Sequence, residues 1–77
     1  MGNEKRSFEA GETMTLTPRE TEILSLVAGG NKRVAIAEML SISFETVNGH
    51  LDKAREKLDA KNTVNAVAIC IREKIII

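Results

Sequence analysis

The stretch ISFETVNGHL, residues 42–51, has the spacing of an amphipathic helix with an unusual outward face. Val47 and Leu51 would pack inward, which leaves Asn48 and Gly49 outside with little charge and almost no bulk. Short polar groups on a helix suit the edges of base pairs, because the major groove of DNA admits an α-helix. The stretch therefore predicts a helix whose exposed side enters that groove.

The side chains on this face are able to form specific hydrogen bonds with bases. The amide of Asn48 can pair bidentately with adenine, and the carboxylate of Asp52 can accept from the amine of cytosine. Gly49 costs the helix about 1 kcal/mol relative to alanine. Two interpretations of this glycine stay open: it permits close approach to DNA, or it is tolerated because the helix is anchored at both ends.

The segment LTPRETEILSLVAGG carries the signals of a first helix that would support the second and third. Thr17 would be the N-cap, Pro18 the first helical residue and Glu20 the N3 partner of a capping box. Gly29 and Gly30 would end the helix. Its predicted buried stripe is Ile23, Leu24 and Val27.

A second helix is expected at about residues 33–40, just before the polar-faced one. Its cap is poor, because Asn31 can serve as N-cap but Lys32 cannot. Its inner stripe would be Ile36, Ala37 and Leu40, with Met39 as a core filler. Residues 41–43 form a three-residue turn, and Ser43 caps the helix that follows.

The polar-faced helix has one apolar stripe to anchor it. Ile42 precedes the cap and Val47 stands at N4, which is the arrangement of a hydrophobic staple. The stripe is Val47, Leu51, Ala54 and Leu58, and the helix should end near residues 59–61. A helix, a short turn and a stapled helix over residues 33–58 match the spacing of a helix-turn-helix.

Asn62 would cap a fourth helix that runs to about Lys74. One of its faces is formed by Val64, Val67, Ala68 and Ile71, and a second apolar side by Ala66, Ile69 and Cys70. Either this helix is fully buried, or its extra face packs against its twin in a dimer. The single cysteine cannot form an internal disulfide and is expected to be an inert thiol in the core or the interface.

Composition sets limits on the partners. The chain of 77 residues is enough for one small domain, and its 11 Lys and Arg balance its 11 Asp and Glu. DNA-binding domains are usually basic, so the zero net charge argues against strong non-specific affinity. Residues 44–59 sum to −1, because the cations Lys53, Arg55 and Lys57 face the acids Glu45, Asp52, Glu56 and Asp59. Lys53, Arg55, Glu56 and Lys57 are expected to form a solvated face.

Several classes of function are disfavoured. His50 is the only histidine and is expected to be a half-buried helix residue, so we predict neither a metal site nor a cofactor. The sequence shows none of the features that would indicate an enzyme, such as paired carboxylates, a cysteine–histidine pair or a phosphate-binding loop. Residues 1–13 are predicted to be a disordered arm or linker, and 14–77 the folded domain. We expect a cytoplasmic protein that contacts no membrane, because no signal peptide is visible and the apolar end IREKIII is too short to span a bilayer.

The motifs LTPRETEIL, IAEMLSISFETVNGHL and KLDAKNTVNAV resemble the DNA-binding domain of LuxR/FixJ-type (GerE-like) bacterial regulators. The resemblance covers residues 16–77 without a gap, and LSIS and HLDKAREKL are most similar to the quorum-sensing branch. It implies an all-α, four-helix helix-turn-helix domain that dimerises through the last helix. Its partners would be double-stranded DNA, a second copy of the chain and RNA polymerase, with no small molecule bound by this domain.

The resemblance also assigns site residues. Positions 48, 49 and 52, here Asn48, Gly49 and Asp52, would point at bases. Thr46, together with Lys32, Arg33 and Val34 at the start of the second helix, would approach phosphates, and Lys53 is a further candidate. The dimerising residues would be Val64, Val67, Ala68 and Ile71.

Two departures from the family pattern concern binding. The family usually has Lys or Arg at position 48 and Lys at position 34, where this chain has Asn48 and Val34. Each lost phosphate contact weakens binding and flattens its salt dependence. The leading hypothesis is a dimeric, sequence-specific DNA-binding domain of a transcriptional regulator. The alternative is an interaction domain that binds DNA poorly and pairs with a related regulator to block it.

Overall fold

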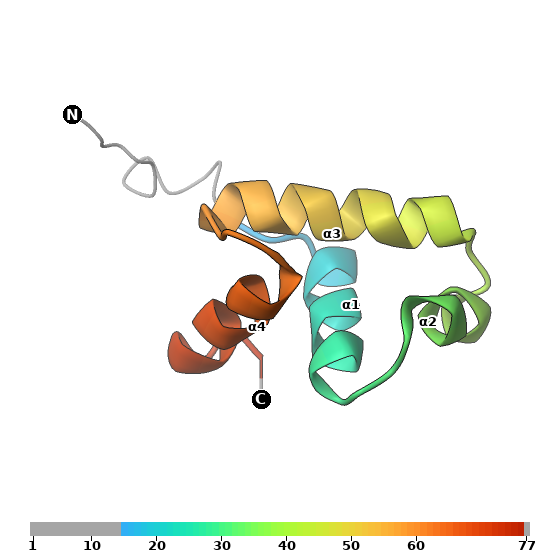
Figure 1. Cartoon of the computed structure of the whole chain (residues 1–77), viewed down its shortest axis with the longest axis horizontal. Helices are drawn as coiled ribbons and strands as arrows, with labels where there is room; N and C mark the ends of the chain where they lie inside the picture. The colour runs from blue at the N-terminus through green and yellow to red at the C-terminus, as the bar shows by residue number, and fades with distance from the viewer. Residues whose placement is uncertain (1–14, 77) are drawn as a thin grey trace.

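The computed structural model describes residues 15–76, and the predicted arm at residues 1–13 lies outside them. The described part of the chain holds four helices and no strand: α1 (Pro18–Ala28), α2 (Arg33–Leu40), α3 (Phe44–Leu58) and α4 (Thr63–Arg72). In Figure 1, α3 runs along one side of the molecule, and α1, α2 and α4 all lie on its other side. The predicted all-α, four-helix class is confirmed. None of these helices is long and apolar enough to cross a bilayer.

Helix α1 begins and ends as its sequence predicts. The Thr17 hydroxyl accepts from the Glu20 N–H at 3.1 Å, and the Glu20 carboxylate accepts from the Thr17 N–H at 3.0 Å, which completes the capping box. At the other end Gly30 has φ of +95°, a conformation that favours glycine. The Asn31 amide donates to the Leu26 carbonyl at 2.9 Å, so this side chain closes the end of α1. Our expectation that Asn31 would cap α2 is wrong: the N-cap is Lys32, which makes no side-chain cap bond.

The turn between α2 and α3 fixes where α3 starts. Ser41 takes the left-handed conformation, with φ of 58°, and the Ile42 N–H returns to the Ala37 carbonyl at 3.0 Å. Ser43 then caps α3, because its hydroxyl accepts from the Thr46 N–H at 3.0 Å. In Figure 1 the turn lies at one end of α3, and α2 is seen largely end-on while α3 lies across the view. The two helices therefore cross steeply.

The core forms around the apolar stripe of α3. All four predicted stripe residues are buried, and α3 packs against each of the other three helices. Its buried partners come from every other helix: Ile23 and Leu24, Ile36 and Ala37, and Ala66 and Cys70. The prediction that Met39 fills the core is wrong, because Met39 lies on α2 and is 54% exposed. Aliphatic packing of this kind contributes roughly 25 cal/mol per Å² of buried apolar surface.

Helix α4 is buried on one side only. It ends at Arg72, two residues before the predicted end, because Lys74 takes a left-handed φ of 61°. The second apolar side is the inner one, where Cys70 is fully buried and burial raises the pKa of its thiol. The interpretation of α4 as a fully buried helix is wrong, because Val64 is 78% exposed and Ile71 is 51% exposed.

A charged pair ties α3 to the start of α1. Lys57 donates to the Glu20 carboxylate at 2.9 Å and to the Thr15 carbonyl at 3.3 Å. The Glu20 side chain is only 5% exposed and that of Lys57 is 23% exposed. The expectation that Lys57 belongs to a solvated face is therefore wrong. The exposed pair Arg19–Glu22 on α1, at 3.2 Å, is a contact of the ordinary surface kind.

This pair makes the fold sensitive to acid. Burial by itself raises the pKa of the Glu20 carboxyl, but the hydrogen bonds from the Thr17 backbone and Lys57, the Lys57 charge and a smaller contribution from His50 outweigh it. The folded pKa therefore lies below the ordinary value of 4.5. A lowered carboxyl pKa stabilises the fold at higher pH, and this stabilisation is lost as the pH falls through the folded pKa.

We expect Glu20→Gln to lower the free energy of unfolding at neutral pH by about 1 to 2 kcal/mol, since a bond to a charged partner is lost. The variant should also lose less stability than the wild type between about pH 6 and pH 3, which urea unfolding at several pH values measures. Glu22→Gln is the control, because this exposed carboxylate on the same helix should change neither property noticeably. Parallel acid-induced losses in wild type and Glu20→Gln would contradict the assignment.

Candidate nucleic-acid interface

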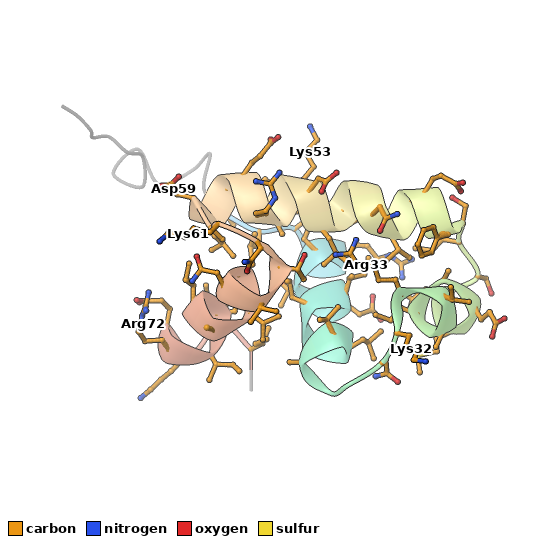
Figure 2. The ribbon with its side chains drawn as sticks, viewed as in Figure 1. Lys32, Arg33, Lys53, Asp59, Lys61 and Arg72 are labelled. Carbon is orange, nitrogen blue, oxygen red and sulfur yellow. The ribbon has the colours of Figure 1, made fainter. Side chains whose placement is uncertain are left out.

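Among the described residues 15–76, no other helix covers the outward side of α3. Gly49, Asp52 and Lys53 are all exposed, and a methyl group added at Gly49 would meet no atom within 4 Å. Figure 2 shows Lys53 pointing away from the body of the fold. Because the opposite side of the helix is held in the core, these three positions are presented on a fixed support.

Asn48 occupies a different position from its neighbours. It is half-buried at the flank of α3, and its side-chain oxygen accepts a hydrogen bond from Arg33. The other terminal nitrogen of Arg33 donates to the Thr63 hydroxyl at 2.9 Å. In Figure 2 the Arg33 side chain lies beneath α3, on the side that faces the other helices. The guanidinium thus joins the first residue of α2, the flank of α3 and the first residue of α4.

The two basic residues at the start of α2 are placed differently. Lys32 is exposed, and in Figure 2 it lies on the far side of α2 from α3, whereas Lys53 lies on the outer side of α3. Arg33 is half-buried and is engaged by two side chains. The structure therefore does not gather the three predicted cations on one face.

Thr46 stands in the first turn of α3, close to its cap. It is exposed, and its hydroxyl lies 2.8 Å from that of Ser43 while its N–H donates to the same side chain. The start of a helix carries a partial positive charge that favours phosphate oxygens. Thr46 is thus at the end of α3 where a phosphate contact is electrostatically easiest.

The exposed surface of α3 is acidic. Its charged residues in the exposed class are one cation and three acids, Lys53 against Glu45, Asp52 and Glu56, which sum to −2. Lys57 lies outside this set because it is partly covered and paired with Glu20. With Asp59 included, the exposed charges of residues 44–59 sum to −3, against −1 for all charges of the same residues, because Arg55 and Lys57 are both half-buried.

Helix α4 presents an uncovered apolar face. Val64, Ala68 and Ile71 are exposed, and their spacing of four and three residues places them on one side of the helix. Val67, the fourth predicted residue of this face, is half-buried against the core. The face therefore consists of three exposed residues with a fourth at its inner edge.

The Arg33 contacts are the functional feature that sequence reasoning missed. Asn48 and Thr63 are 15 and 30 residues from Arg33 along the chain. No helix-period or capping rule connects residues at such distances. Only a knowledge of which helices lie side by side would have brought the three together.

A steeply crossed helix pair with a short turn, braced by two further helices, defines a helix-turn-helix domain. The chain belongs to the luxR family of bacterial regulatory proteins, whose residue pattern matches residues 14–70. This confirms the resemblance carried by the three sequence motifs.

Three relatives illustrate the similarity. The chain is 46% identical over 61 residues to the transcriptional activator protein BjaR1 of Bradyrhizobium diazoefficiens, covering 79% of this chain and 25% of that protein. It is 43% identical over 56 residues to the transcriptional regulatory protein DesR of Bacillus subtilis, covering 73% and 28%. It is 49% identical over 53 residues to the quorum sensing-dependent transcriptional regulator RpaR of Rhodopseudomonas palustris, covering 69% and 22%. The chain thus spans about a quarter of the length of these three relatives. No solved structure matches the chain.

We expect Gly49→Ala to raise the free energy of unfolding by about 1 kcal/mol, because alanine favours the helix interior and its methyl group meets open space. Gly30→Ala should have the opposite sign, since φ is +95° there and strains any other residue. Urea unfolding of the two variants measures both effects. A destabilised Gly49→Ala would show that the fold itself requires this glycine.

Proposed function

We propose that the chain is the sequence-specific DNA-binding domain of a bacterial transcriptional regulator and that α3 enters the major groove. The observation that supports this most directly is the exposure of Gly49, Asp52 and Lys53 on a helix whose opposite side is anchored in the core. A rigid support matters because base contacts must be held within a fraction of an ångström. Membership of the luxR family supports the same conclusion.

The contacts divide by the chemistry of the residues. Asn48, Gly49 and Asp52 lie along α3 where they face base edges, through the amide, through close approach and through a carboxylate that accepts from cytosine. Thr46, at the start of α3, and Lys53, two turns further along the helix, contact phosphates. The resemblance assigns Lys32 and Arg33 to phosphates. Lys32 is exposed and able to make such a contact, whereas the guanidinium of Arg33 is bound to Asn48 and Thr63.

The domain acts as a homodimer in this proposal. Val64, Ala68 and Ile71 form an apolar face that a second copy of α4 would cover, with Val67 at its inner edge. A two-fold dimer presents two copies of α3, and two copies match the half-sites of a palindrome. We further propose that the domain works in the cytoplasm, where the regulator it belongs to contacts RNA polymerase.

A second candidate function has one observation in its favour. The exposed charges of α3 sum to −2, and an acidic face repels the phosphates that supply most of the affinity of DNA-binding proteins. A domain with this surface could keep the dimerising face of α4 and pair with a related regulator without binding DNA itself. Such a protein would block its partner.

A selection from random duplexes separates the two functions. We expect the wild type to retain a palindrome saturably at about 50 mM salt, and Thr46→Ala and Asn48→Ala to bind it more weakly. Lys53→Ala should weaken binding to all sequences and reduce the slope of log K against log salt by about one for each subunit. Arg19→Ala, which removes an exposed cation from α1, is the control. No retained DNA at this salt concentration would favour the blocking function.

Sedimentation tests the dimer separately. We expect Ile71→Asp to convert the wild-type dimer to a monomer, because a carboxylate on the α4 face would be buried without a partner. Met39→Asp is the matched control, since it places the same charge on an exposed apolar residue of α2. A wild type that sediments as a monomer at all concentrations tested would contradict the assignment of this face.

A further inference from the structure

We infer that Arg33 is a positioning residue that sets the base preference of α3, because it fixes the Asn48 amide with the oxygen turned inward and the NH₂ group left for DNA. The inference rests on the proposed function and names a determinant of its specificity. It is carried by one cluster, in which Arg33 donates to the Asn48 oxygen and to the Thr63 hydroxyl.

The chemistry of arginine settles which end of the amide points inward. A guanidinium has five N–H donors and no acceptor, so the Asn48 atom that contacts it must be the oxygen. The NH₂ group then lies at the other end of the planar amide. Were the side chain flipped, two donors would face each other and the contact would be lost.

The arginine itself is held from two sides. Thr63 is the first residue of α4 and accepts from the second terminal nitrogen at 2.9 Å, while the first nitrogen bonds to Asn48. The Arg33 residue is half-buried, so the aliphatic part of its side chain is partly covered by the fold. An amide oriented in this manner does not have to lose rotational freedom when a base arrives, which favours binding in the one orientation available.

The consequence concerns which bases Asn48 can recognise. Bidentate pairing with adenine needs both an acceptor and a donor on the amide, because adenine presents the N6 amine and N7. With its oxygen turned inward to Arg33, Asn48 presents only the donors of its NH₂ group to a base. Guanine presents two acceptors, O6 and N7, whereas cytosine presents only a donor amine. The wild type should therefore prefer guanine and reject cytosine at the position facing Asn48, in place of the adenine that the free side chain would select.

The test is a base-substitution series at that position, measured with the full chain for wild type, Arg33→Met, Asn48→Ala and the double variant. Methionine keeps a long apolar stem but cannot donate, so it should release the Asn48 oxygen. We expect the adenine-to-guanine preference to rise by roughly tenfold in Arg33→Met, the size of one good base contact. The same substitution should change nothing in the Asn48→Ala background. Thr63→Val, which removes one anchor of the arginine without touching the amide, should give a smaller shift in the same direction.

Two results overturn the inference while DNA binding persists. The first is an unchanged base preference in Arg33→Met. The second is a uniform loss of affinity with a salt slope reduced by about one for each subunit, which would show that Arg33 holds a phosphate. Arg19→Met controls for the loss of one cation and should leave the preference alone. A wild type that retains no DNA overturns the proposed function, and the base preference with it.

A second measurement tests the contact without DNA. Urea unfolding of the same four chains forms a double-mutant cycle for Arg33 and Asn48. We expect the two substitutions to be coupled by roughly tenfold in the unfolding constant, as a hydrogen bond to a charged group predicts. Additive effects of the two substitutions would overturn the contact itself.

Discussion

The structure depends on the burial of one apolar stripe on α3 against three other helices. Val47, Leu51, Ala54 and Leu58 are all buried, and each remaining helix contributes residues to the same cluster. This burial decides which side of α3 turns outward, because a helix with one stripe in the core has only the opposite side to present. Every contact proposed between α3 and DNA follows from that orientation.

In the folded chain, some of the cationic side chains are bound by other residues of the domain. Lys57 is bound to the buried Glu20 carboxylate, and the Arg33 guanidinium is engaged by two neutral side chains. With Arg55 and Lys57 half-buried, the exposed charges of α3 sum to −2, so its outer surface is acidic. A protein of this kind relies less on phosphate attraction than a basic domain does, and specific base contacts must carry more of its affinity. The proposed role of Asn48 would then give the orientation of its amide a large share in base recognition.

One side of α4 packs in the core, and its other side is exposed. Ala66 and Cys70 close the core, while Val64 and Ile71 remain exposed. A chain this short buries a limited core, and a partner that covers apolar surface adds stability that the monomer lacks. Since Thr63, at the start of the same helix, holds Arg33, the proposed dimer helix and the proposed base-contacting helix are joined by one side chain.

The sequence by itself determined the helices, the caps of α1, α3 and α4, and the stripe of α3. These features depend on residues three or four apart, such as Thr17 with Glu20, and local geometry is the same in any fold. Tertiary structure alone decided that Lys57 leaves the solvated face for Glu20, 37 residues away, that Arg33 holds Asn48, and that Met39 is exposed. These outcomes depend on which helices lie side by side and at what angle. The type of a residue and its spacing from nearby residues do not predict which distant part of the chain will pack against it.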